Sequence, residues 1–171
     1  MPHPALWLVG LELHRFSPAA DPAASVARSL SAGAEPELQL AAYEGPALQP
    51  YAGLRAGPFA FILAPSLSLH EAPLDGEDVR SREGRLEGRA RWEGGRWFVG
   101  ADLAVAGGST QYAGQRVASS AAYFEAGPTV GAIVALGPHV GFVARARWPL
   151  RWEAAGASAE LTGALGMEWR P

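Results

Sequence analysis

The chain has 171 residues, a net charge of −3, no Cys, 21 Gly and 14 Pro. This length is normally one domain and is long enough to close a barrel or bury a core. The Gly and Pro content favours short strands and turns over a helical bundle. All 14 basic residues are Arg and they form no cluster, which argues against a nucleic-acid partner. The lack of Cys excludes disulfides and thiolate metal sites.

The sequence has neither a membrane helix nor a secretion signal. No run of about 18 apolar residues is present, which excludes a transmembrane helix. The start, MPHPALWLVG, lacks a positively charged region followed by an apolar stretch and a cleavage site. An exported protein would therefore have to be the mature form, or a domain cut from a longer precursor.

The first part of the chain predicts three strands. Apolar and polar residues alternate over 5–16, as in a half-buried strand. Residues 17–37 carry no such alternation and predict a long loop, with a short helix around 23–30 as a possible insertion. A second strand is expected within 38–54, interrupted or bulged at Gly45-Pro46 and at Pro50 because Pro cannot donate to a ladder. The alternation returns over 59–70 and predicts the third strand.

The central stretch predicts a hairpin of strands 86–93 and 96–106 around the turn Glu93-Gly94-Gly95. In both strands one face is free of charge, and in the first strand the other face is almost entirely charged. One long loop is expected on each side of this hairpin. One is the charged stretch 71–85, with a turn at Asp75-Gly76, and the other is the Gly/Ser-rich stretch 107–121.

Three more strands are expected at 122–136, 140–150 and 160–169, with a tight turn at Gly137-Pro138-His139 and a loop over 151–158. Long and short connections alternate along the chain. In an up-and-down barrel this order places the longer loops at one end, and the tight turns with both termini at the other. The sequence therefore predicts one all-β domain over residues 1–171, an eight-stranded antiparallel up-and-down transmembrane β-barrel.

The two faces of the strands predict which one meets lipid. The apolar face mixes large residues with Gly and Ala, a mixture that lipid tolerates but that would leave cavities inside a soluble barrel. Trp residues gather near the strand ends on this face, as in the aromatic belts of membrane proteins. The residues expected in this aromatic girdle are Trp7, Trp92, Trp97, Trp148 and Trp169.

The opposite face carries acidic and basic residues in nearly equal number. In a membrane barrel of eight strands this face becomes a lumen filled by side chains, so the charges are expected to pair. The predicted lumen ion-pair network comprises Glu12, Glu87, Arg89, Arg91, Asp102, Glu125, Arg145, Arg147, Glu160 and Glu168. The alternative is a soluble, lipocalin-like barrel that binds a small apolar ligand, with the Trp residues as core anchors and the charged face as its solvated exterior.

These features resemble the small eight-stranded outer-membrane barrels of the OmpA/OmpX-like, porin-fold superfamily. The resemblance covers 5–169 and includes a closing strand, LTGALGMEW, that ends in an aromatic residue. Here Trp169 is followed by Arg170-Pro171, whereas such barrels usually end on the aromatic residue itself. The resemblance implies a Gram-negative outer-membrane protein with a structural or interaction role, such as anchoring, adhesion or membership of a complex. Outer-membrane lipid and other envelope proteins, met through the long loops, are the expected partners.

Chemical motifs are few. His14 and His70 are expected near the loop-side rim, with Glu12 and Ser68 close in register. A His, a Ser and a carboxylate could form a hydrolytic site of the kind that outer-membrane lipid-modifying hydrolases carry, and this is a minor alternative. The same His pair supplies at most two metal ligands. We therefore expect no enzyme activity, no metal and no cofactor.

Overall fold

The computed structural model describes residues 6–14, 47–74, 77–112, 115–119, 123–153, 156–159 and 161–171. The predicted helix at 23–30, the break at Gly45-Pro46 and the side chain of Glu160 lie outside the described residues. None of the described residues belongs to a helix long and apolar enough to cross a membrane. The strands are β1 (Leu6–His14), β2 (Ala47–Ala56), β3 (Phe59–Leu74), β4 (Glu77–Gly94), β5 (Trp97–Tyr112), β6 (Gln115–Ser119), β7 (Tyr123–Ala135), β8 (Val140–Arg147), β9 (Leu150–Glu153), β10 (Gly156–Ala159) and β11 (Thr162–Trp169).

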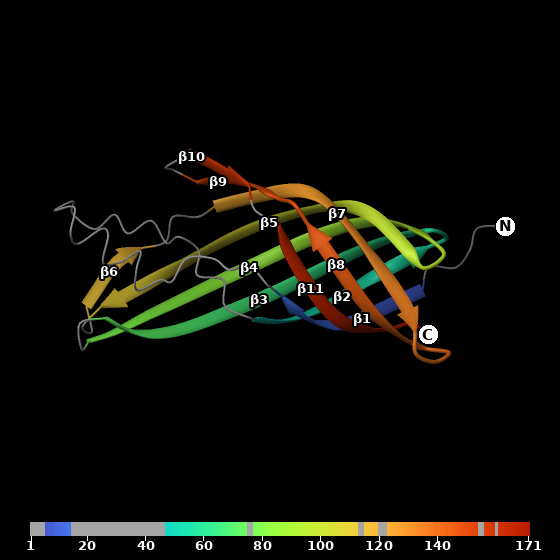
Figure 1. Ribbon diagram of the computed structural model, residues 1–171, viewed down its shortest axis with the longest axis horizontal. Coiled ribbons are helices and arrows are strands. Elements are labelled where there is room, and N and C mark those ends of the chain that lie inside the picture. Colours follow the sequence, from blue (N-terminus) through green and yellow to red (C-terminus); the bar gives the residue numbers. More distant parts are fainter. Residues whose placement is uncertain are drawn as a thin grey trace.

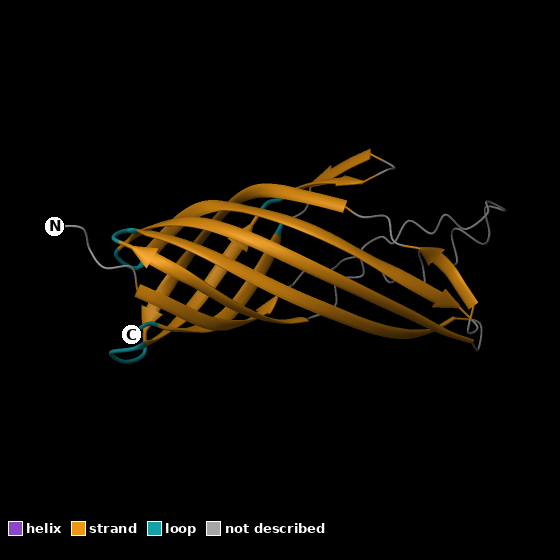
Figure 2. Cartoon of the chain, turned by 180° about the vertical axis from the view of Figure 1, so that it is seen from behind, coloured by secondary structure: helices purple, strands orange, loops and turns teal. Residues whose placement is uncertain are grey.

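The sheet closes on itself as an antiparallel barrel. β1 pairs with β2 on one side and with β11 on the other, and β5 pairs with β7. The order around the barrel is β1-β2-β3-β4-β5-β7-β8-β11, which confirms the predicted all-β fold of eight strands (Figure 2). A closed barrel has no free edge along its wall, so the backbone polar groups of its strands can pair within the wall.

The short strands β9 and β10 continue β8 and β11. The pairing of Ala159 with Leu150 in β9–β10 lies in the same register as the pairing of Thr162 with Arg147 in β8–β11. The break falls at Trp148-Pro149, where Pro149 has no N–H to donate. β9 also keeps the register of β8 against β7. The two pairs of strands therefore form one long hairpin, and 151–153 and 156–158 are strand where the sequence predicted a loop.

The registers define the stagger of the barrel. Hydrogen-bonded neighbours lead from Leu6 through Arg55, Ala60, Arg91, Gly100, Thr129 and Arg147 to Thr162. Ala164, two residues beyond Thr162 on β11, pairs with His14, which is eight residues beyond Leu6 on β1, so the total stagger around the barrel is ten residues. With about 3.4 Å per residue and 4.8 Å between strands, a stagger of ten gives a strand tilt of about 40° and a radius of about 8 Å. Only side chains fit inside such a barrel.

The two ends of the barrel differ (Figure 1). One end, called the turn end here, carries the tight turns at Gly57-Pro58, Gly95-Arg96 and 136–139 together with both chain ends. At the other end, called the loop end, β3, β4 and β5 project beyond the other strands of the barrel, and β6 pairs with the far end of β5. This placement of tight turns and chain ends agrees with the predicted up-and-down topology.

Two of the expected long loops prove to be strand. β3 and β4 stay paired out to Leu74 and Glu77, so 71–74 and 77–85 extend the hairpin and only Asp75-Gly76 separates the strands. Similarly, β5 runs to Tyr112 and pairs there with β6. The prediction failed because these segments lack alternating apolar residues. A strand with both faces in polar surroundings shows no apolar alternation, although its backbone ladder continues.

β2 also differs from the prediction. It spans Ala47–Ala56 and contains Pro50, which pairs with Leu11 in an unbroken β1–β2 register, so the expected bulge at Pro50 is wrong. The β2–β3 ladder includes Ala52 to Ala56 only, so the missing N–H of Pro50 lies beyond it. Next to Pro50, the side-chain amide of Gln49 donates to the carbonyl oxygen of Ala64 on β3 at 3.0 Å and holds the two strands together.

Candidate functional site: a lumen filled by ion pairs

Exposure alternates along the strands, as the sequence pattern predicts. On β8 the side chains of Val143, Arg145 and Arg147 are buried, while Phe142 on the other face is exposed. The exposed face of the barrel is apolar and the buried face is charged. A soluble barrel with an apolar ligand inside would need the opposite arrangement, so the burial pattern argues against the lipocalin-like alternative.

One group of charged side chains, called the mid-lumen cluster here, fills the centre of the barrel. Its hub is Glu87 on β4, which is fully buried and contacts four guanidinium groups. The distances from its carboxylate oxygens are 2.6 Å to Arg89 Nε, 2.9 Å to Arg145 Nη1, and 3.1 Å to both Arg85 Nη2 and Arg147 Nη1. The cluster comprises Glu12, Arg85, Glu87, Arg89, Asp102, Glu125, Arg145, Arg147 and Arg151.

The other three carboxylates of this cluster share the same guanidinium groups. Asp102 accepts from Arg145 Nη1 at 2.6 Å, and Glu12 accepts from Arg145 Nη2 at 3.0 Å. Nearer the loop end, Glu125 accepts from Arg85 and from Arg151, each at 2.7 Å. Four of the Arg residues bridge acids on different strands, so the cluster links separate walls of the barrel; they are Arg85, Arg89, Arg145 and Arg147. Buried charges persist only with such partners.

A second group, called the turn-end cluster, lies in the lumen near the tight turns. Arg91 Nη2 donates to both oxygens of Glu168 at 2.7 and 2.8 Å, and the Tyr51 hydroxyl donates to Glu168 Oε2 at 2.9 Å. Arg170 donates to Glu168 at 2.6 Å and to Glu93 at 3.0 Å. The cluster comprises Tyr51, Arg55, Arg91, Glu93, Glu168 and Arg170. Charged side chains therefore cross the lumen at two levels.

Apolar and aromatic side chains fill the remaining space. One buried cluster contains Leu8, Ala60 and Ile62, and another contains Phe98, Ile133 and Val143. The Arg91 guanidinium lies over the Phe98 ring at 5.1 Å, and the Arg89 guanidinium lies over the Tyr51 ring at 5.3 Å. Gly131 makes room for Phe98, because a Cβ at Gly131 would come within 2.2 Å of that ring. Side chains thus pack across the turn-end part of the bore.

The predicted network residues can now be placed. The structure brings nine of the ten into the two clusters, and the tenth, Glu160, lies outside the described residues. Seven of them join the mid-lumen cluster, whereas Arg91 and Glu168 belong to the turn-end cluster. Arg91 pairs with Glu93 and Glu168, and Glu168 pairs also with Arg170, all within the turn-end cluster. Strand alternation could not predict this division, because it assigns a residue to a face but not to a height in the barrel.

Several lumen residues were not predicted from the sequence. Arg85 and Glu93 continue the charged face of β4 at every second position, and this alternation could have identified both. Gln49 and Tyr51 were missed because β2 was poorly defined. Arg170 was taken to follow the last strand, yet its guanidinium group turns back into the lumen.

The predicted hydrolytic residues are not brought together by the described backbone. His14 pairs with Ala47 and Ala164, whereas His70 pairs with Ser81 far out on the β3–β4 hairpin. The side chains of His14, Ser68 and His70 lie outside the described residues, and Glu12 is occupied by Arg89 and Arg145. No group of three His, Asp or Glu side chains able to hold a metal ion occurs among the described residues.

The Trp side chains of the predicted girdle all face outward. Trp7, Trp92, Trp97 and Trp169 lie within a few residues of the turn end, and each is about half exposed or more. Trp148 follows β8 and is 62% exposed. On β9, Trp152 stacks against Phe124 of β7, with 5.4 Å between the ring centroids. Trp148 lies on the same continued strand, four residues nearer the turn end than this stacked pair.

No family model and no curated protein sequence matches the chain. Solved structures with the same fold do match. Neisserial surface protein A is 14% identical, with a TM-score of 0.52 over 97% of this chain and 94% of that one. Ail, the attachment invasion locus protein of Yersinia pestis, in complex with the heparin analogue sucrose octasulfate, is 11% identical, with a TM-score of 0.53 over 98% and 97%.

A third similar structure is a major outer membrane protein from Thermus thermophilus. It is 12% identical, with a TM-score of 0.56 over 99% of this chain and 100% of that one. These identities show the fold alone. The chain has the fold of the small eight-stranded outer-membrane β-barrels, and it matches them over 94–100% of their length.

Proposed function

We propose that this protein is a structural or interaction protein of the bacterial outer membrane, with a lumen closed to solutes and no enzyme activity. The observation that carries the proposal is the division between the two faces. Charged side chains paired across the bore fill the inside, and large apolar side chains cover the outside. In a bilayer this division places the large exposed apolar side chains against lipid and keeps the buried charges against partners.

The height of the apolar wall fits a bilayer. Val134 and Phe124 are ten residues apart on β7, and both are exposed. With about 3.4 Å per residue and a tilt of about 40°, they span roughly 25 Å, the height of the apolar band of outer-membrane barrels. Phe124 and Trp152 then mark the loop-end edge of the band. The four Trp residues near the turn end mark the other edge. Trp148, which the sequence predicted in the girdle, would instead lie within the band, because the strand continues beyond it as β9.

The contact surface in this proposal is the loop end, where β3, β4 and β5 extend beyond the rest of the barrel (Figure 2). Outer-membrane barrels direct this end outward. The match to Ail, solved with a heparin analogue, supports a surface role in general terms. Outer-membrane lipid and other envelope proteins are the partners we propose, and capture of cross-linked partners from outer membranes would identify the proteins.

Conductance tests the closed lumen. We expect the purified protein, inserted into a planar bilayer, to show no steady current of porin size, because two levels of ion pairs cross the bore. Insertion is checked independently by resistance of the barrel to protease added to the vesicles. Steady porin-size conductance would contradict the closed lumen, whereas a protein that stays folded and monomeric in water without detergent would contradict the membrane setting.

A further inference from the structure

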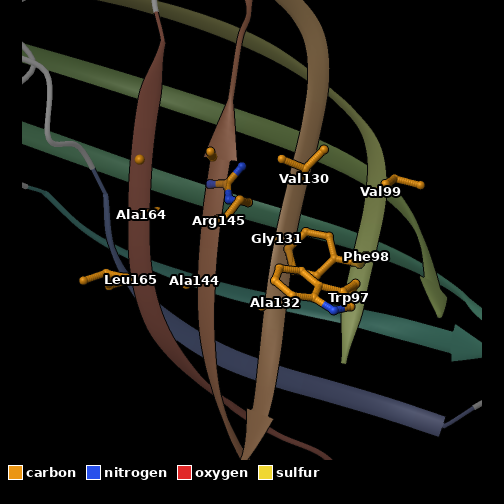
Figure 3. Close-up of a pocket in the computed structure, with 12 residues that line it drawn as sticks. Trp97, Phe98, Val99, Val130, Gly131, Ala132, Ala144, Arg145, Ala164 and Leu165 are labelled. Atoms are coloured by element: carbon orange, nitrogen blue, oxygen red, sulfur yellow. The ribbon is translucent and has the colours of Figure 1, made fainter. Parts of the chain in front are cut away.

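The lipid-facing wall is not smooth. Two apolar hollows lie on its described part. The smaller one, called the alanine groove here, crosses β5, β7, β8 and β11 and has a volume of about 530 Å³. Its floor consists of small residues and its sides of large ones. Figure 3 shows Ala132 and Ala144 between Trp97 on one side and Leu165 on the other.

The strand registers explain the shape of the groove. Trp97, Ala132, Ala144 and Leu165 follow one another across four paired strands, so two small residues lie between two large ones. The next row of outward-facing residues lies two residues farther from the turn end. There Val99 and Val130 are followed by Ala146 and Gly163. The small residues therefore lie on β7 and β8 in the first row and on β8 and β11 in the second. The result is an oblique channel that begins at Trp97 and rises along the wall away from the turn end.

A cationic residue lies at the turn-end mouth of this channel. Arg96 is exposed in the β4–β5 turn, directly before Trp97. Its carbonyl oxygen accepts from Ile133 N of β7 at 2.8 Å, which places the residue over the β5–β7 seam. Arg96 has no acidic partner among the described residues. The nearby acid, Glu93, is buried and already contacts Arg55, Arg91 and Arg170.

We propose that the alanine groove and Arg96 together bind one anionic glycerophospholipid of the turn-side leaflet, such as phosphatidylglycerol. The acyl chain lies in the groove, and the headgroup phosphate lies against the Arg96 guanidinium at the level of the Trp residues. An unpaired Arg at a membrane surface attracts anionic headgroups, and Trp side chains are placed at the same depth. This inference rests on the membrane setting proposed above.

The second hollow supplies a control. It crosses the wall between Trp7 and Leu103, has a volume of about 850 Å³, and includes Ala90 in its floor. The basic residue next to its turn-end mouth is Arg55, which is engaged by Glu93 at 3.1 Å. Without a free cation at its mouth, this hollow should exchange acyl chains too quickly to retain a lipid once the barrel leaves the vesicle. Charge, and not volume, therefore distinguishes the two sites.

Native mass spectrometry of the protein released from mixed vesicles of phosphatidylglycerol and phosphatidylcholine tests the proposal. We expect one retained lipid per barrel, with phosphatidylglycerol favoured about fivefold, the effect of one Arg near a membrane surface. Arg96→Gln should abolish the preference. Ala144→Phe, which fills the alanine groove, should abolish the retention itself, whereas the matched Ala90→Phe in the other hollow should change neither.

Three results would overturn the proposal. The first is equal retention of the two lipids by the wild type, and the second is an unchanged preference in Arg96→Gln. The third is the appearance of dimers that Ala144→Phe removes, because a second copy of the chain would then cover the groove. Protease protection of the same vesicles separates this inference from the proposed function. A barrel that inserts but shows no lipid preference contradicts only the lipid site, and a barrel that fails to insert contradicts the membrane setting as well.

Discussion

The lumen and the outer wall of this barrel are built from the same strands but are stabilised differently. In the lumen, each charge depends on particular partners, and the Glu87 carboxylate alone contacts four guanidinium groups. On the wall, neighbouring residues range from Gly88 to Phe61, and none depends on a specific partner. In the lumen, the loss of stability should therefore depend on which residue is replaced. On the wall, it should depend on the polarity of the new side chain and on its depth in the bilayer.

The largest effect is expected at the hub of the lumen. Glu87→Ala removes the shared carboxylate and leaves Arg85, Arg89, Arg145 and Arg147 with too few partners. Loss of one partner from a buried ion pair costs about 3–5 kcal/mol. Urea unfolding in lipid vesicles measures the free energy of unfolding. The control is Leu86→Ala on the outward face of the same strand, and an equal loss in both variants would contradict the distinction between lumen and wall.

The next effect concerns the wall. Ala90→Arg places a charge on the outward face of β4 at mid-height, where we expect a loss of about 2–4 kcal/mol in the same unfolding measurement. Ala144→Arg on β8 should behave alike. Ala56→Arg, beside the turn at Gly57-Pro58, should cost only about 0–1 kcal/mol because its side chain reaches the interface. If the cost were the same at both depths, the wall would not face lipid.

The smallest effect tests the difference between the two clusters of the lumen. Tyr51→Phe removes one hydroxyl that donates to Glu168, which keeps its contacts with Arg91 and Arg170. We expect a loss of about 1 kcal/mol, the usual contribution of a single hydrogen bond. A loss as large as that of Glu87→Ala would show that the turn-end cluster depends on its tyrosine as much as the mid-lumen cluster depends on its hub.

Sequence alternation predicted the barrel where each strand has one apolar face. Along 86–93, Leu86 and Trp92 face outward and Glu87 and Arg91 face inward, as the structure shows. The same signal failed beyond the apolar band. The hairpin of β3 and β4 continues to Leu74 and Glu77, but Glu71 pairs there with Arg80, a polar pairing that resembles a loop in the sequence. In the proposed membrane setting these polar strand segments lie beyond the lipid, so they need no hydrophobic alternation.

The sequence predicted which residues of the candidate site face the lumen, but not which of them pair with one another. Alternation identified Glu12, Asp102 and Arg145 as inward-facing residues on three strands. Glu12 and Asp102 both contact the Arg145 guanidinium. This meeting depends on the stagger of the barrel, which sets the height of each residue and is not encoded in any single strand. For the same reason the sequence did not reveal that Arg170, beyond the last strand, reaches Glu93 of the β4–β5 hairpin.

The facing of the wall and the lumen is the central claim, and two single-cysteine variants test it most directly because the chain has no Cys of its own. Ala90→Cys places a nitroxide on the outward face of β4. Ala60→Cys places one on the inward face of the adjacent β3, one residue away in register. Both labels are attached to the unfolded chain before it is folded into vesicles. We expect lipid-soluble oxygen to relax the label at residue 90 strongly and the label at residue 60 weakly, and the reverse order would contradict both the facing and the membrane setting.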